Sequence, residues 1–158
     1  MKKFELTTEQ KINWFGRTLY RIKACISFTT TSGDEVKAGD LGGFVEKESN
    51  LSHDGKAWVW GNAKVCGDAE VFSVNHILVI GPAGSRSDFT TFFRDKDNEI
   101  TVKCGCFLGK IDKFLEKVSR THGDNKHALV YRAAVEVAKL QIDLTEEVSE
   151  ESEDKSNE

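Results

Sequence analysis

Four residues of the types that bind metal ions lie in the second half of the chain: Cys104, Cys106, His122 and His127. Cysteine thiolates and histidine imidazoles are the ligands of structural zinc sites, so zinc is the one cofactor that the sequence suggests. Fifteen residues separate Cys106 from His122 and four separate the two histidines, which is irregular spacing for a zinc finger. The cysteines lie two apart on a predicted strand, so we expect their thiols on one face. Buried thiols and packed histidines at a helix end explain the same residues without a metal, and we expect no cofactor.

The same residues are the candidates for nucleophilic catalysis. Cys104 or Cys106 with His122 would form a cysteine–histidine pair, but no family signature surrounds either cysteine. His53 and Asp54 would supply a general base and the carboxylate that orients it, and a loop dipeptide is the simpler interpretation. The sequence therefore assigns no catalytic residue, and an enzyme is the less favoured class of function.

Aromatic and basic residues are the candidates for binding. Trp58, Trp60 and Phe72 lie in a regular repeat, where at least one ring should face outward unless a flanking segment covers it. Arg86 and Arg94 follow a glycine-rich stretch, where they would bind an anion or mark the solvated end of a hairpin. We predict a binding site from these five residues.

The segment from Gly55 to Phe72 is a repeat of three six-residue units. The units read Gly-Lys-Ala-Trp-Val-Trp, Gly-Asn-Ala-Lys-Val-Cys and Gly-Asp-Ala-Glu-Val-Phe. A fixed six-residue period is typical of a β-helix. Glycine opens each unit because it accepts the positive φ angle that a corner of the chain requires. We therefore predict a short β-helix, a solenoid-like block of sheet.

Alternation within each unit predicts which side chains face the core of this block. Alanine and valine lie two positions apart, so they point to one side of an extended backbone. Six residues should be buried: Ala57, Val59, Ala63, Val65, Ala69 and Val71. The residues between them should point outward: Lys56, Trp58, Lys64 and Glu70. A weaker continuation of the period extends the repeat to residues 40–78, about two coils, which are too few to stand alone and need capping by flanking segments.

One β-hairpin is predicted before the repeat and another after it. Before it, residues 12–15 and 17–28 are the predicted arms on either side of Gly16, and apolar and polar side chains alternate along the second arm. After it, strand-like runs at residues 89–93 and 100–107 surround a polar turn at residues 95–98. Both hairpins would lie against the ends of the repeat and cap it.

Two helices are predicted to follow the second hairpin. Apolar residues spaced by three and four positions from Ile111 predict a helix that ends at Gly123. Asp124 or Asn125 would cap a second helix that runs to about Leu144. Its polar residues form one narrow stripe: Arg132, Glu136, Lys139 and Asp143. So narrow a stripe predicts a helix that is mostly buried against the hairpin, the repeat or another copy of the chain.

The predicted fold class is α+β, with four segments along the chain. Residues 1–38 form an N-terminal β cap and residues 39–80 form the hexapeptide-like repeat. Residues 81–144 form a β-hairpin with two helices, and residues 145–158 form a disordered acidic tail. The short β-helix would thus be capped by a hairpin on one side and by the hairpin and helices on the other.

Charge is distributed unevenly along the 158 residues. The formal net charge is −4, but seven acidic residues and one lysine after Thr145 contribute −6, which leaves the rest of the chain at +2. No basic block of the kind that binds nucleic acid is present. No apolar run is long enough to span a membrane, and the N-terminus lacks the apolar core of a signal peptide. We expect a cytoplasmic protein.

Several motifs resemble those of a family of phage and prophage proteins. They are residues 17–22 (RTLYRI), residues 39–46 (GDLGGFVE), residues 50–52 (NLS) and the Gly-x-Ala-x-Val-x units. The segment from Ser85 to Tyr131 resembles a C-terminal unit that some members append. That family carries hexapeptide-like, β-helical repeats in blocks of variable length. The resemblance covers nearly all of the chain except the acidic tail, and it brings no catalytic residues with it.

A hexapeptide period is also similar to that of acyltransferases built on trimeric left-handed β-helices. In those enzymes the aliphatic residue is followed at once by glycine or an acidic residue, whereas here glycine comes two positions after valine. No histidine lies within the regular units. The match to this family is therefore poor.

The resulting hypothesis is a non-enzymatic, phage-encoded module that binds a host protein. The resemblance implies a role such as inhibition of a host defence system, for example a CRISPR nuclease. A hexapeptide-type acyltransferase or a cysteine-dependent hydrolase is the alternative. We expect neither nucleic acid nor membrane as a direct partner. We also expect a homodimer, because a short β-helix has open ends and Trp58 and Trp60 add apolar surface.

Overall fold

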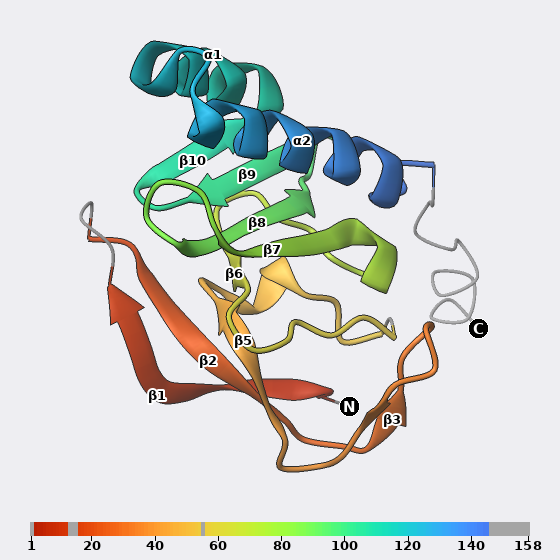
Figure 1. The fold of residues 1–158 in the computed structure, drawn as a ribbon. Helices are drawn as coiled ribbons and strands as arrows, with labels where there is room; N and C mark the ends of the chain where they lie inside the picture. The colour runs from red at the N-terminus through yellow and green to blue at the C-terminus, as the bar shows by residue number, and fades with distance from the viewer. Residues whose placement is uncertain (1, 13–15, 55, 146–158) are drawn as a thin grey trace.

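Two four-stranded sheets and two helices form the core of the computed structural model, which describes residues 2–12, 16–54 and 56–145 (Figure 1). The helices α1 (Ile111–His122) and α2 (Lys126–Gln141) cover one face of the second sheet. The first sheet and the repeat segment lie on its other side. The fold is thus mixed α+β, and none of the described helices is long and apolar enough to cross a membrane.

The first sheet has the strand order β1-β2-β5-β6. Its strands are β1 (Phe4–Ile12), β2 (Thr18–Ala24), β5 (Leu41–Val45) and β6 (Lys64–Val65). The first three run antiparallel, whereas β6 is parallel to β5. The pairing of β1 with β2 confirms an N-terminal hairpin, but its first strand is Phe4–Ile12 rather than the predicted residues 12–15, of which 13–15 lie outside the described residues. A small ladder of β3 (Phe28–Thr29) and β4 (Glu35–Val36) connects β2 to β5.

The second sheet is antiparallel throughout, in the order β10-β9-β8-β7. Its strands are β7 (Ile77–Ala83), β8 (Asp88–Arg94), β9 (Ile100–Cys104) and β10 (Phe107–Lys110). The pairing of β8 with β9 confirms the second predicted hairpin. Neighbouring residues alternate between the faces: Phe92 packs under the helices and Phe93 packs against the repeat. This sheet therefore separates two apolar cores.

Both predicted helices are confirmed, with the predicted signals at their ends. Gly123 follows α1 with a φ angle of 59°, and its N–H donates to the carbonyl of Ser119. The side-chain oxygen of Asn125 accepts a hydrogen bond from the backbone N–H of Ala128 at 3.0 Å and caps α2. The second helix ends at Gln141, three residues before the predicted end.

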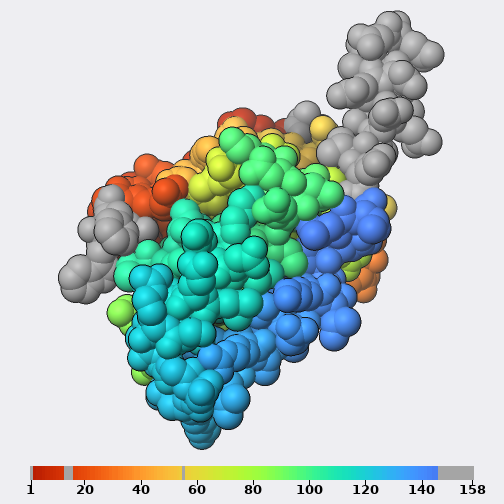
Figure 2. Space-filling view, turned by 90° about the horizontal axis from the view of Figure 1, so that it is seen from above, coloured from red at the N-terminus to blue at the C-terminus, as the bar shows by residue number. Residues whose placement is uncertain are grey.

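Within one copy of the chain, α2 is buried on one face only, and burial of its other face against another copy stays a prediction. One face of α2 packs on the sheet through five residues: Ala128, Tyr131, Ala134, Val135 and Ala138. On the opposite face Leu129, Val137 and Leu140 are exposed, and Leu140 keeps 89% of its surface in contact with solvent. Figure 2 shows this helix (blue) along the outer surface of the protein. A narrow polar stripe does not exclude an apolar stripe on the solvent side.

The predicted β-helix is wrong, because the described residues form no closed or solenoid sheet. Within residues 56–72, the described part of the three regular units, the only strand is β6, which is two residues long. Val45 pairs in parallel with Val65, and Leu51 pairs in parallel with Val71. The paired residues are twenty positions apart, which is not a multiple of six, and no further coil follows within the described residues. After the repeat, β7 instead pairs antiparallel with β8. Two coils bury too little surface to stand alone, so antiparallel sheets supply the remaining contacts.

The inward positions of the repeat are nevertheless as predicted. All six alanine and valine residues are buried: Ala57, Val59, Ala63, Val65, Ala69 and Val71. Gly61 and Gly67 have φ angles of 45° and 61°, which confirms that glycine lies at corners. The first glycine, Gly55, lies outside the described residues. The period thus identifies the buried positions without determining how they are paired.

The burial of Trp58 contradicts the prediction that its side chain points outward. Its side chain is 1% exposed and its ring meets that of Phe28 edge-on, with centroids 5.7 Å apart. A Cβ atom on Gly42 would lie 2.8 Å from Cζ2 of this indole, so glycine is needed for the close approach. The β2–β5 connection therefore covers the ring that the repeat alone would expose.

Lys3 is a buried cation at the edge of the same core. Its Nζ donates to the carbonyl of Ala57 at 2.7 Å and lies 5.3 Å from the centroid of the Phe28 ring. Burial lowers the pKa of Lys3 to about 8, against a smaller opposing effect of Asp54. Folding therefore favours the neutral amine at this position.

We predict that Val65→Asp destabilises the fold by about 3 kcal/mol or more, because it places a carboxylate without a partner at a fully buried position. Chemical denaturation measures the free energy of unfolding. Asn62→Asp adds the same charge at an exposed site of the same repeat and serves as the control. Equal stability of the two variants would contradict the burial of Val65.

We predict that Lys3 makes stability rise with pH in the alkaline range. Between pH 8 and its ordinary pKa of 10.5, Lys3 is protonated in the unfolded chain and mostly neutral in the folded protein. Since the unfolded state then binds more protons, the free energy of unfolding increases by about 2 kcal/mol across that window. Denaturation of Lys3→Met at several pH values should lack this increase, whereas Lys2→Met at the exposed neighbour should retain it. Parallel curves for the protein and Lys3→Met would refute the assignment.

Candidate functional site

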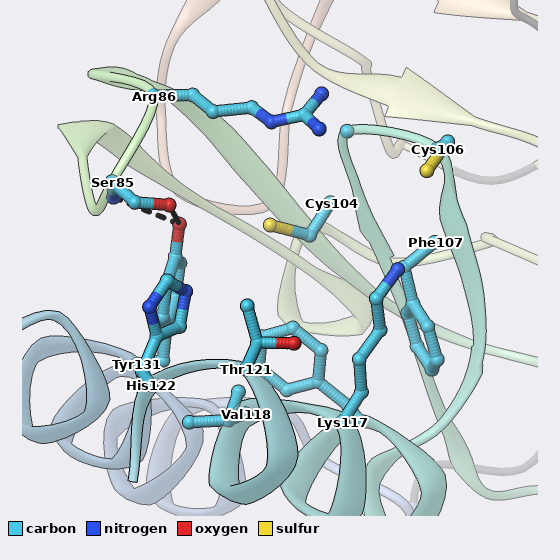
Figure 3. Close-up of a pocket in the computed structure, with 12 residues that line it drawn as sticks. Ser85, Arg86, Cys104, Cys106, Phe107, Lys117, Val118, Thr121, His122 and Tyr131 are labelled. Carbon is cyan, nitrogen blue, oxygen red and sulfur yellow. Dashed lines mark hydrogen bonds between the residues drawn. The ribbon is translucent and has the colours of Figure 1, made fainter. Parts of the chain in front are cut away.

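A cavity of about 230 Å³ lies between the second sheet and the helices (Figure 3). The β7–β8 turn, the β9–β10 turn and both helices contribute to its wall. Its lining combines thiols, cations and aromatic rings: Ser85, Arg86, Cys104, Gly105, Cys106, Phe107, Phe114, Lys117, Val118, Thr121, His122 and Tyr131. The fold thus brings Arg86 and His122 to one cavity with Cys104 and Cys106, although each lies at least sixteen positions from the cysteines in the sequence.

Cys104 and Cys106 do not share a strand face, contrary to the prediction. Cys104 ends β9 and pairs with Phe107 of β10, so Gly105 and Cys106 form the turn between the strands. Gly105 has a φ angle of 57°, as the first position of a tight hairpin turn requires. Figure 3 shows the Cys104 thiol pointing toward the middle of the cavity and Cys106 at the end away from Tyr131. The hydroxyl of Thr90 donates to the Cys104 sulfur at 3.4 Å.

Tyr131 of α2 connects the helices to the β7–β8 turn. Its hydroxyl accepts a hydrogen bond from the backbone N–H of Ser85 at 3.1 Å and lies 3.3 Å from the Ser85 hydroxyl. Its ring stacks on His122, with centroids 5.7 Å apart, and meets Phe114 edge-on. A side chain at Gly84 would collide with this hydroxyl, so the close approach depends on glycine. Tyr131 therefore fixes one wall of the cavity.

The predicted zinc ligands are not gathered around one point. His122 and His127 have ring centroids 5.6 Å apart, but His127 does not line the cavity with the two cysteines. Within the described ranges, no three side chains of histidine, cysteine, aspartate or glutamate come together as metal ligands.

The predicted binding residues are spread over separate parts of the fold. Trp60 is 43% exposed, in agreement with the expectation for one ring, whereas Phe72 is half-buried. The guanidinium of Arg94 lies 4.8 Å from the centroid of the Phe72 ring and donates to Asn98 at 2.9 Å. Arg94 thus stabilises the hairpin end rather than facing a cleft. Arg86 lines the cavity described above, and Phe72 lines a separate one together with His53.

His53 is not arranged as a general base. Its Nδ1 accepts a hydrogen bond from the backbone N–H of Lys3 at 3.1 Å, so the neutral ring carries its proton on Nε2. Nε2 lies 3.9 Å from a carboxylate oxygen of Glu48, and the ring stacks on Phe4 at 4.3 Å. Because the lone pair of Nδ1 is already used, His53 can accept no proton from a nucleophile without losing this contact.

A second cavity, of about 320 Å³, lies between the two sheets and is rich in positive charge. We call it the inter-sheet cleft. It is lined by Lys11, Ile12, Leu19, Lys64, Arg86, Asp88, Lys103 and Gly105. Sequence analysis found only Arg86 among its cations. The lysines come from three different strands, and no local pattern links them.

Comparison of the chain with known protein families, curated protein sequences and solved structures finds no match.

We predict that the four thiols differ strongly in reactivity. Cys25 is exposed, whereas Cys66 is fully buried and burial raises the pKa of its thiol to about 11. At pH 8 about one Cys66 side chain in a thousand is then the reactive thiolate. Mass spectrometry after brief iodoacetamide treatment of the native protein should show modified Cys25 and unmodified Cys66. Denaturant provides the control, since all four cysteines should then react. Equal rates at Cys25 and Cys66 in the native protein would contradict this prediction.

Proposed function

We propose that the protein is a non-enzymatic binding module that occupies the surface of another protein. The observation that supports this proposal is the outer face of α2. Leu129, Ala133, Val137 and Leu140 are spaced by four, four and three positions, which places them on one stripe of the helix. This stripe lies opposite the buried face, and all four residues are exposed. Contiguous apolar surface of this kind is typical of a protein–protein contact.

Charged side chains border this stripe and would form the polar rim of an interface. Lys126, Arg132, Glu136 and Lys139 lie on the same helix, and Glu136 and Lys139 form an ion pair at 3.6 Å. An apolar centre with a polar rim is the usual composition of a contact surface. The partner would present an apolar groove to α2, as in other complexes in which a helix lies in a groove.

The resemblance to phage and prophage proteins supports a bacterial host protein as the partner. Inhibition of a defence system such as a CRISPR nuclease is the role that we propose, by analogy with small phage proteins that act by occupying a surface. A second copy of the chain is the other candidate for the α2 stripe. The expected homodimer contact would then involve this helix rather than Trp58, which is buried.

A cysteine-dependent hydrolase remains the alternative enzyme, because Cys104 and His122 line one cavity. Acyl or ester turnover that is lost in Cys104→Ser would support it. An acyltransferase has less support, since the repeat forms no β-helical wall in the described residues. Absence of such turnover together with stoichiometric capture of a host protein favours the binding module.

We predict that Leu140→Lys abolishes partner binding without lowering stability. Because Leu140 is almost fully exposed, the free energy of unfolding should change by no more than about 0.5 kcal/mol. Capture from host lysate, followed by a titration with the purified partner, should show loss of binding. Leu41→Lys is the matched control, since Leu41 is an exposed leucine on β5.

Light scattering on the same variants identifies the occupant of the stripe. A dimer that becomes a monomer in Leu140→Lys would make a second copy the occupant. Equal binding by Leu140→Lys and Leu41→Lys would refute a role for the α2 stripe.

A further inference from the structure

Four cations from different elements converge on the inter-sheet cleft. Lys11 comes from β1 and Lys64 from β6 of the first sheet. Arg86 comes from the β7–β8 turn and Lys103 from β9 of the second sheet. Among the described residues that line the cleft, Asp88 is the only acidic one, so these residues carry an excess of three positive charges.

These cations have no carboxylate partner in the part of the chain that the structure describes, where no Asp or Glu oxygen lies within 4.0 Å of any of them. By contrast, Arg17, Arg21 and Lys110 each have a carboxylate oxygen at 2.7 Å. Asp88 uses one carboxylate oxygen to accept a hydrogen bond from the N–H of Phe89. Unpaired cations are therefore concentrated where the two sheets meet.

Lys103 is the most unusual of the four, because it is 3% exposed. Its ammonium donates to the carbonyl of Gly105 in the β9–β10 turn. Burial lowers the pKa of Lys103, and the ammonium of Lys64 lowers it further because the two positive charges repel each other. An anion between these lysines would remove the repulsion and supply the missing countercharge.

The β9–β10 turn also positions Arg86. A Cβ atom on Gly105 would lie 3.3 Å from a guanidinium nitrogen of Arg86, so the arginine packs directly over the glycine. On the other sheet, the Nζ of Lys11 lies 4.7 Å from the centroid of the buried Phe44 ring. A hydrogen bond thus holds Lys103 in place before any ligand arrives, and Lys11 and Arg86 each pack against one neighbouring group, which lowers the entropic cost of binding.

We propose that the inter-sheet cleft binds a phosphate group, either as inorganic phosphate or as the phosphate of a small phosphomonoester. A phosphate dianion offers several acceptor oxygens to the ammonium and guanidinium donors around it, and arginine binds phosphate through two parallel hydrogen bonds. The volume of about 320 Å³ is at the lower end of the range for ligand pockets, which suits a small ligand. The site is separate from the α2 stripe, so the proposal is independent of the proposed function.

Calorimetric titration of the full chain at low ionic strength tests the proposal, with inorganic phosphate and glycerol phosphate as probes. We expect saturable binding of at least one probe, and the stronger binder distinguishes free phosphate from a phosphomonoester. Arg86→Gln should weaken binding about 10- to 100-fold, as expected for loss of a charged hydrogen-bond donor. Lys96→Gln is the control, because it removes one positive charge outside the cleft. The Nζ of Lys96 lies 3.8 Å from a carboxylate oxygen of Asp68. This variant should leave affinity within about twofold.

Backbone amide chemical shifts of the unsubstituted protein give a second measurement that does not depend on variants. Phosphate should shift the amide signals of Lys64, Lys103 and Gly105 in a saturable manner. If phosphate produced neither a heat of binding nor a change in amide chemical shifts, the proposal would be overturned. Equal loss of phosphate affinity in Arg86→Gln and Lys96→Gln would also overturn it. Binding of nucleic acid or an acidic peptide without binding of either phosphate probe would overturn it too.

Discussion

Asp95 connects the repeat to the second sheet, because its carboxylate binds the β8–β9 turn, β9 and β10 while its backbone pairs with the repeat. Its side chain is 1% exposed and accepts hydrogen bonds at 2.6–3.1 Å from four donors: Lys110 Nζ, Thr101 Oγ1, and the backbone N–H groups of Asp97 and Glu99. Its backbone forms an antiparallel bridge to Ala69 of the repeat. Burial by itself raises the pKa of Asp95, but these hydrogen bonds outweigh it and hold the pKa below its ordinary value. The buried charge thus orders the β8–β9 turn and the end of β10, where α1 begins, and the backbone of the same residue holds the last unit of the repeat.

This connection also explains why the repeat does not continue as a solenoid. The antiparallel bridge of Ala69 to Asp95 and the hydrogen bond from the N–H of Lys96 to the carbonyl of Asp68 bring the β8–β9 turn beside the last unit. On the other side, β5 pairs with β2 of the N-terminal hairpin. Both neighbours are antiparallel elements from outside the repeat. The backbone groups that would have paired with another coil are therefore used by the flanking sheets.

The two surfaces to which we assign binding have a common origin in this layered arrangement. One face of α2 packs on the second sheet, and no described element covers its opposite face, so Leu129, Val137 and Leu140 remain exposed. The inter-sheet cleft lies where the two sheets approach each other, and lysines from both sheets face the gap. We propose that the apolar stripe binds a protein surface and that the cationic cleft binds a small anion. They lie on different elements, so one chain can carry both.

The sequence by itself determined the local features of this protein. Alternation and spacing predicted both hairpins, both helices with their Gly123 and Asn125 ends, and the six buried positions of the repeat, because these depend on neighbours along the chain. It also selected Arg86 as an anion-binding residue, a role that stays a prediction. Only the tertiary structure decided the pairing of the repeat, the burial of Trp58 and the convergence of Lys11, Lys64 and Lys103 on Arg86. Strand pairing depends on which distant segments compete for the same backbone groups, and a period within one segment contains no information about those competitors.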